Sequence, residues 1–146
     1  MGLQGEKSAE WFRRASASLI NGVSSQFRYW GDDDTLVIDR GEGGHLYDVD
    51  GHRYIDYQCG FGPIILGHGH PKVAAAVAEA AAEGTTFAMT ARREVEAAET
   101  VMEALGWADG MRFTNTGTEA TMHAIRLARG YTGRDIVVKF EGQYHG

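Results

Sequence analysis

Apolar residues in the first third of the chain come in short runs, separated by glycine and charged residues. Residues 35–39, 45–49 and 53–57 are three such runs, and they are rich in the residue types that strands favour. The pair Asp50-Gly51 separates the second run from the third, and this pair strongly favours a tight hairpin turn. The sequence therefore predicts a small antiparallel unit near the N-terminus.

Longer patterns on either side of this unit favour helices. Residues 6–20 mix apolar side chains with small and charged ones, which predicts a short amphipathic helix or arm. Pro71 suits the first turn of a helix that continues to about Glu83, and Gly84 suits its end. Between the antiparallel unit and this helix, the glycine-rich stretch up to Pro71 indicates a loop.

A further helix is predicted over residues 91–105, with Thr90 as its N-terminal cap. Glutamates occupy its outward positions. One face carries the apolar side chains Val95, Ala98, Met102 and Leu105.

The last third of the chain has a strand, helix, strand rhythm. We expect a strand at 111–114, a turn at 115–118, a helix at about 119–130 that ends near Gly133, and an apolar strand at 136–140. Such a unit nearly always forms a right-handed crossover between parallel strands.

Composition narrows the function classes. The 146 residues carry a net charge of -6 and no basic stripe, which argues against nucleic-acid binding. No apolar run approaches the ~20 residues of a membrane span, and the N-terminus lacks the apolar core of a secretory signal. The single cysteine, Cys59, fits a reducing compartment. These features predict a soluble, cytoplasmic protein without a membrane or nucleic-acid partner.

The turn at 115–118 precedes a predicted helix and has two readings. A helix N-terminus exposes unpaired backbone N–H groups and a partial positive charge, so Gly117 and the flanking threonine hydroxyls suit a phosphate group. Thr116 and Glu119 also have the spacing of a capping box, which alone explains the turn. From local spacing, both readings stay open.

Four ordered segments resemble the glutamate-1-semialdehyde aminomutase and class III aminotransferase family. They are LYDVDGHRYIDY at 46–57, GPIILGHGHP at 62–71, FTNTGTEATMHAIRLARGYTGRD at 113–135 and KFEGQYHG at 139–146. The resemblance extends over residues 22–146. It implies a pyridoxal 5'-phosphate (PLP) enzyme that moves an amino group in a small, amino-acid-like substrate.

The resemblance also implies a fold. The family has the type I PLP fold, so we expect an α/β structure: a small antiparallel unit and the start of a large domain with a mostly parallel sheet. Residues 1–68 would form the N-terminal arm and small-domain segment, and residues 69–146 the incomplete start of the large PLP-binding domain. The family works as a homodimer, which we expect of the full-length protein.

Cofactor-binding residues follow by resemblance from two segments. The family's phosphate-binding turn corresponds to Thr116, Gly117 and Thr118. The tyrosine that packs on the PLP ring corresponds to Tyr144, and His145 follows it. An aromatic ring suits this position because offset stacking stabilises a flat cofactor by ~1 kcal/mol. The alternative for Tyr144 is an ordinary tyrosine that anchors the loop, and His145 can simply hydrogen-bond the loop.

Substrate-binding residues are expected near the N-terminus. The segment from Ser25 to Arg28 matches the family segment whose arginine binds a substrate carboxylate, and a guanidinium can make two parallel bonds to that group. Without the resemblance, Arg28 is an ordinary surface arginine. The family usually has tryptophan at Phe61 and Pro-Val at Gln26-Phe27. These departures keep open substrates other than glutamate-1-semialdehyde, including β-amino acids.

No metal site is expected. His68 and His70 have the spacing of two ligands on a strand, but their segment matches a family loop that binds no metal, and no third ligand cluster is visible.

The resemblance implies that the Schiff-base lysine lies beyond residue 146. None of Lys7, Lys72 and Lys139 matches it, so no catalytic residue is expected in this chain. We therefore expect an enzyme in the full-length protein and a 146-residue fragment that is inactive alone. The alternative is a non-catalytic phosphate-binding or dimerising module.

Overall fold

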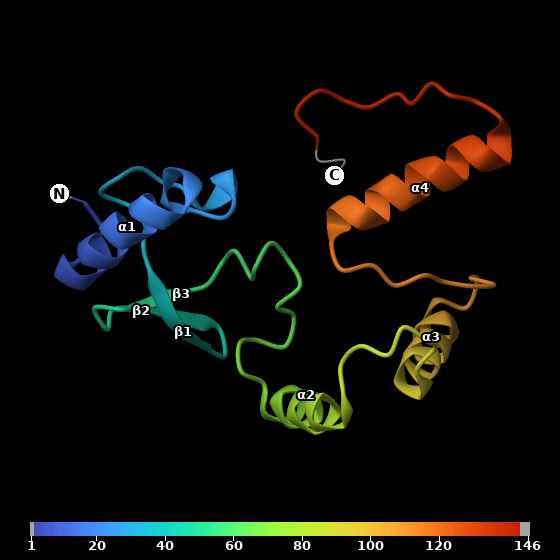
Figure 1. Cartoon of the computed structure of the whole chain (residues 1–146), viewed down its shortest axis with the longest axis horizontal. Coiled ribbons are helices and arrows are strands. Elements are labelled where there is room, and N and C mark those ends of the chain that lie inside the picture. Colours follow the sequence, from blue (N-terminus) through green and yellow to red (C-terminus); the bar gives the residue numbers. More distant parts are fainter. Residues whose placement is uncertain (1, 144–146) are drawn as a thin grey trace. The chain divides into compact units, whose positions relative to one another are not determined.

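The computed structural model describes residues 2–143 (Figure 1). These form two compact units, and the division lies between Thr85 and Thr86. The first unit contains α1 (Glu6–Ser18), the 3₁₀ helices η1 (Ile20–Gly22) and η2 (Gln26–Arg28), β1 (Ile38–Glu42), β2 (His45–Asp48), β3 (Arg53–Ile55) and α2 (Pro71–Glu83). The second contains α3 (Arg92–Leu105) and α4 (Gly117–Thr132). The division between arm and large domain expected after residue 68 remains a prediction.

The three strands form one antiparallel sheet in the order β1-β2-β3, which confirms the small antiparallel unit. The first strand begins three residues later than expected. Thr35 is buried there, and its hydroxyl donates to the Gly31 carbonyl and accepts the Trp30 N–H, so this segment closes a turn before the strand starts. The third strand ends two residues earlier than expected, because the Asp56 carboxylate accepts the N–H groups of Gln58 and Cys59 and so starts the next loop.

The hairpin turn between β2 and β3 is built around the buried carboxylate of Asp48. It accepts hydrogen bonds from the backbone N–H groups of Asp50 and His52 and from the Tyr54 hydroxyl. Burial alone would raise the pKa of Asp48, but the hydrogen bonds from His52 and Tyr54 lower it. Burial and the neighbouring Asp48 raise the pKa of Tyr54 to about 12. The predicted turn is thus stabilised by a side chain as well as by its glycine.

The hairpin turn also caps α1. The residue before α1 is Gly5, which has no side chain to accept the helix's first N–H groups. Asp50 accepts them instead, at 2.9 Å from the Lys7 N–H and 2.8 Å from the Ser8 N–H. A carboxylate is favourable at this end of a helix because the macrodipole is positive there. The expected N-terminal helix is therefore confirmed, and a hydrogen-bonded turn fixes its start.

The far half of α1 packs onto the chain that follows it. Phe12 is buried and its ring lies 6.4 Å from that of Tyr29. Gly22 has a φ of 70° and lies so close to Phe12 that a Cβ there would meet the ring at 2.7 Å. Only glycine meets both demands without strain.

The helices α2 and α3 follow their sequence signals closely. Pro71 is the first residue of α2 and Gly84 ends it with a φ of 118°, as expected. The cap of α3 is Ala91 rather than Thr90, because the Glu94 carboxylate accepts the Ala91 N–H. Gly106 ends α3 in the left-handed conformation. No helix in the described part of the chain is long and apolar enough to cross a membrane.

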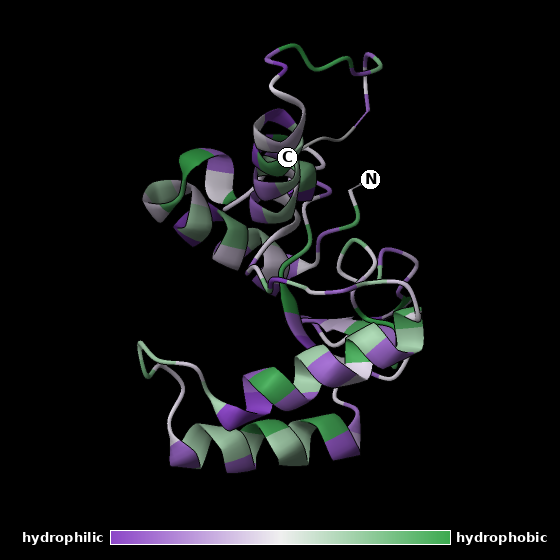
Figure 2. Cartoon of the chain, turned by 90° about the vertical axis from the view of Figure 1, so that its right-hand side faces the viewer, coloured by the Kyte–Doolittle hydropathy of each residue, from purple (hydrophilic) through white to green (hydrophobic). Residues whose placement is uncertain are grey.

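The two strands expected in the last third are wrong. Among residues 2–143, no strand follows β3. The segment 111–113 lies along α3 instead and borders an open groove of about 530 Å³. The segment 136–140 has no regular secondary structure and is exposed, and Figure 2 shows its hydrophobic residues in green. A strand needs a hydrogen-bonded neighbour, and no described segment supplies one to either run.

Candidate active site

The predicted carboxylate-binding residue Arg28 ends the short helix η2. Its backbone N–H donates to the Ser25 carbonyl at 2.9 Å, which fixes the turn. The side chain of Arg28 is exposed, and the described residues offer it no hydrogen bond or ion pair. Its guanidinium donors are therefore available to an acceptor from outside the unit.

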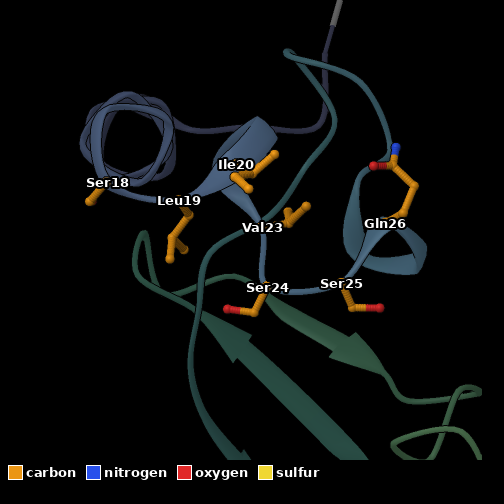
Figure 3. Close-up of a pocket in the computed structure, with 7 residues that line it drawn as sticks. All are labelled: Ser18, Leu19, Ile20, Val23, Ser24, Ser25 and Gln26. Atoms are coloured by element: carbon orange, nitrogen blue, oxygen red, sulfur yellow. The ribbon is translucent and has the colours of Figure 1, made fainter.

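Ser25, the other predicted residue of this segment, borders an open depression of about 440 Å³. Figure 3 shows that its lining comes from the end of α1 and the chain leading to η2. The lining residues are Ser18, Leu19, Ile20, Val23, Ser24, Ser25 and Gln26. None of them titrates near neutral pH, so this depression can bind a polar or apolar group but cannot perform acid–base chemistry.

Phe61 lies against Phe27, so the structure brings together the two segments expected to contact substrate. Their ring centroids are 6.0 Å apart, with the rings at 65° to each other, an edge-to-face contact. Both rings stay largely exposed, Phe27 at 72% and Phe61 at 63%. The sequence did not predict the contact between Phe27 and Phe61. It showed only that Phe27 differs from the residue usual in the family at this position.

The loop that carries Phe61 has an unusual backbone. Four consecutive residues have a positive φ: Cys59 at 48°, Gly60 at 60°, Phe61 at 66° and Gly62 at 110°. For residues with a side chain this region is sparsely populated, and it persists only where surrounding contacts impose it. Here the Phe61 N–H donates to the Gln58 carbonyl at 2.8 Å.

Asp56 fixes the start of this loop. One carboxylate oxygen accepts the N–H groups of Gln58 and Cys59, and the other lies 2.7 Å from Nε2 of His68. The hydrogen bond from His68 is the main cause of the lowered pKa of Asp56, with burial acting against it. The side chain of Asp56 is only 4% exposed. The loop is therefore anchored at a buried, fully engaged carboxylate.

His68 joins the loop to the sheet. Its backbone exchanges two hydrogen bonds with Gly43, at 2.8 and 2.9 Å. Its imidazole ring is hydrogen-bonded to the Asp56 carboxylate, so the side chain of His68 has a structural role in this loop. Within residues 2–143 no group of three or more histidine, cysteine, aspartate or glutamate side chains could hold a metal ion.

The predicted phosphate-binding turn forms the N-terminus of α4. Thr116 is the N-cap, and its hydroxyl oxygen accepts the Glu119 N–H at 3.1 Å. The Glu119 carboxylate accepts the Asn115 N–H at 2.7 Å, one residue earlier than in a standard capping box. The N–H of Gly117 has no hydrogen-bond partner in the described part of the chain. Capping and anion binding are therefore compatible here, since the cap leaves a helix-end donor available.

The remaining predicted site residues, Tyr144 and His145, lie outside the described residues. The substrate-side residues Ser25, Arg28 and Phe61 belong to the first unit, and the turn at Thr116 belongs to the second.

Comparison with known proteins decides the family. The sequence model described as aminotransferase class-III matches residues 29–146. The chain belongs to the class-III aminotransferase family. It is 52% identical over 140 residues to glutamate-1-semialdehyde 2,1-aminomutase of Methanothermobacter thermautotrophicus, which covers 96% of this chain and 33% of that protein. The aminomutase of Syntrophomonas wolfei is 48% identical over 143 residues, again covering 33% of that protein. The chain thus spans about a third of the length of these relatives.

Solved structures confirm the expected fold class. An omega-transaminase from Sphaerobacter thermophilus matches 99% of this chain and 33% of its own, with a TM-score of 0.91 and 37% identity. A transaminase with PLP bound matches 99% of this chain and 34% of its own, with a TM-score of 0.90 and 36% identity. A beta-phenylalanine aminotransferase from Variovorax paradoxus matches 96% of this chain and 32% of its own, with a TM-score of 0.89 and 34% identity. The class-III aminotransferase chain therefore has the α/β fold of the N-terminal part of these enzymes.

Proposed function

We propose that the full-length protein is a PLP-dependent enzyme that moves an amino group in small carboxylated substrates. Glutamate-1-semialdehyde 2,1-aminomutase is the first candidate, because relatives of that name share 45–52% of their residues with this chain. The observation that carries the proposal is the N-terminus of α4. Its Thr116-Gly117-Thr118 turn, inside the region matched by the family, offers donors suited to a phosphate group.

The residues at this turn fit the phosphate of PLP. The 16-residue helix α4 contributes the positive end of its macrodipole, and Gly117 contributes a backbone N–H without a described partner. The Thr116 hydroxyl uses its oxygen for the cap, which leaves its proton to donate outward. Tyr144 would pack on the cofactor ring, and His145 would support that loop. PLP, when bound, supplies the electron sink for the carbon that carries the amino group.

The first unit would recognise the substrate. Arg28 would bind the carboxylate through its exposed guanidinium, and this would orient the carbon that bears the amino group. Ser25 would add a hydroxyl beside it, and Phe61 would limit water on the other side. No lysine of this chain is assigned to catalysis, so we propose that the 146 residues alone are inactive. For the full-length protein we propose a cytoplasmic homodimer.

A second candidate is a class III aminotransferase that acts on another amino acid, such as a β-amino acid. The specific observation in its favour is the contact between Phe27 and Phe61, which makes the substrate side of the site more apolar than a small polar aldehyde requires. The two candidates share the cofactor, the role of Arg28 and the type of bond changed.

Product analysis separates the two candidates. The full-length protein with PLP is incubated with glutamate-1-semialdehyde alone, and separately with a β-amino acid plus a 2-oxo acid acceptor. An aminomutase converts the first without an acceptor, whereas an aminotransferase needs the acceptor and releases an oxo acid. If PLP neither changes the absorption spectrum of the protein nor permits either conversion, the proposed function is wrong.

A further inference from the structure

The rings of Phe27 and Phe61 meet, and Phe27 directly precedes the predicted carboxylate-binding residue Arg28 in sequence. We call these two phenylalanines the aromatic pair. Phe27 precedes Arg28 in η2, so the ring and the guanidinium start from neighbouring Cα atoms about 3.8 Å apart. The edge-to-face contact engages part of each ring and leaves 72% of Phe27 and 63% of Phe61 exposed.

The position of Phe61 is enforced from several directions. Its backbone adopts a φ of 66° within four successive positive values, a conformation that costs free energy for any residue with a side chain. Asp56 and His68 anchor the loop that imposes it. Backbone strain that surrounding hydrogen bonds maintain is typical of residues at ligand-binding sites. The anchored loop thus holds the Phe61 backbone at a place from which its ring meets that of Phe27.

We infer that the aromatic pair determines substrate specificity: together with Arg28 it selects small amino acids that carry an apolar or aromatic group close to the carboxylate. This inference rests on the proposed function and names the substrate class of the same site. Arg28 supplies the charge that a carboxylate requires. The two rings supply a surface on which a third ring can pack in an offset or edge-to-face arrangement. A substrate without such a group leaves both rings facing water and gains nothing from them.

A matched pair of amino donors tests the inference on the full-length holoenzyme. The first probe is 3-amino-3-phenylpropanoate, and the second is 3-aminobutanoate, which has a methyl group in place of the phenyl. The unmodified enzyme should show a kcat/KM at least about tenfold higher for the phenyl probe, since lost apolar contacts typically change discrimination by roughly 10–200-fold. The preference should appear mainly in KM, because the pair binds the substrate without touching the transferred proton.

Substitutions in the aromatic pair should reduce the preference for the phenyl probe. Phe27→Leu and Phe61→Leu should each reduce the ratio of kcat/KM values, phenyl over methyl, by about fivefold or more. Phe61→Tyr keeps the ring and should keep the ratio. Tyr131→Leu is the control, because Tyr131 is an aromatic residue of α4 that is 90% exposed and distant in sequence from the pair. It should leave the ratio unchanged.

A second measurement does not depend on the variants folding. In the unmodified enzyme, 3-phenylpropanoate should inhibit competitively at a concentration at least about tenfold lower than butanoate does. Equal inhibition by the two acids, or an unchanged ratio in both leucine variants with turnover intact, overturns the inference and leaves the proposed function standing. Turnover of glutamate-1-semialdehyde without amino transfer from either probe also overturns the inference and leaves the proposed function standing. Absence of any PLP-dependent turnover overturns both.

Discussion

The two units of the chain differ in how their structure is held. In the first unit, hydrogen bonds connect residues far apart in sequence: Asp50 caps α1 across more than 40 residues, and His68 reaches both Asp56 and Gly43. In the second unit, the Glu119 carboxylate accepts the Asn115 N–H four residues away, and the Thr116 hydroxyl accepts the Glu119 N–H three residues away. Hydrogen bonds between distant residues therefore fix a helix end and a loop in the first unit, whereas bonds between near neighbours cap α4 in the second.

This contrast extends to the proposed roles. In the first unit, the proposed substrate-side residue Phe61 lies on a loop that Asp56 and His68 anchor. The second unit carries the proposed phosphate-binding turn on the end of a helix, an element whose cap forms between near neighbours in sequence. Its apolar residues Ile136, Val138 and Phe140 are 82–90% exposed. The proposed phosphate site thus depends on local contacts, while the proposed substrate side depends on contacts between residues distant in sequence.

The largest effect on stability is expected from Asp56→Ala. The substitution leaves the N–H groups of Gln58 and Cys59 and the His68 ring without their buried acceptor, which should cost about 2–4 kcal/mol. Urea unfolding of the full-length protein measures the change. Asp39→Ala is the matched control, because Asp39 is an exposed aspartate of β1, and it should change stability by less than about 0.5 kcal/mol. Equal losses in both variants would show that Asp56 anchors nothing.

A smaller loss is expected from Gly22→Ala. The added Cβ would meet the Phe12 ring at 2.7 Å in a left-handed conformation, so α1 should loosen at a cost of about 1–3 kcal/mol. Thermal unfolding of the full-length protein provides the readout. Gly44→Ala serves as control, because a Cβ at Gly44 meets no atom within 4 Å. An unchanged melting temperature in the Gly22 variant would contradict the packing of α1 described above.

Thr116→Ala should have a modest effect on stability, about 1 kcal/mol, because it removes only the cap of α4. The same substitution should also weaken PLP binding, because the hydroxyl is a proposed phosphate donor. Thr116→Ser keeps the hydroxyl and should keep both the stability and the affinity for PLP. Thr100→Ala is the control, since Thr100 lies within α3 and bonds only the Glu96 carbonyl of its own helix. PLP affinity that is unaffected in Thr116→Ala would count against this turn as the phosphate site.

The smallest expected effect is on acid stability. The pKa of Asp56 is lowered in the folded state, mainly by His68, so its contribution is present above the unfolded value of about 4 and is lost as pH falls through the folded value. Urea midpoints between pH 7 and pH 3 should therefore fall less steeply in Asp56→Ala than in the unmodified protein. Parallel curves would mean that the carboxylate ionises alike in both states.

The sequence predicted what depends on neighbours along the chain. Pro71 and Gly84 marked both ends of α2, and Asp50-Gly51 marked the hairpin. The start of β1 was misplaced because the Thr35 hydroxyl closes a turn with Gly31, a contact that an alternating pattern does not reveal. The strands at 111–114 and 136–140 failed for the related reason that pairing partners are not encoded locally. At the site, Arg28 and Phe61 were named from family resemblance, but the Phe27 contact emerged only from the folded loop.

The central claim is that the first unit recognises the substrate carboxylate and the second holds the cofactor phosphate. Arg28→Ala in the full-length protein tests it most directly, with KM for the carboxylated substrate and Kd for PLP measured on the same preparation. The account predicts that KM rises roughly 10–100-fold, as expected for a lost charge-assisted hydrogen bond of about 1.5–3 kcal/mol, while the PLP Kd stays within about twofold. An equal loss of substrate and PLP binding would contradict the account, because Arg28 would then be supporting the structure of the whole site.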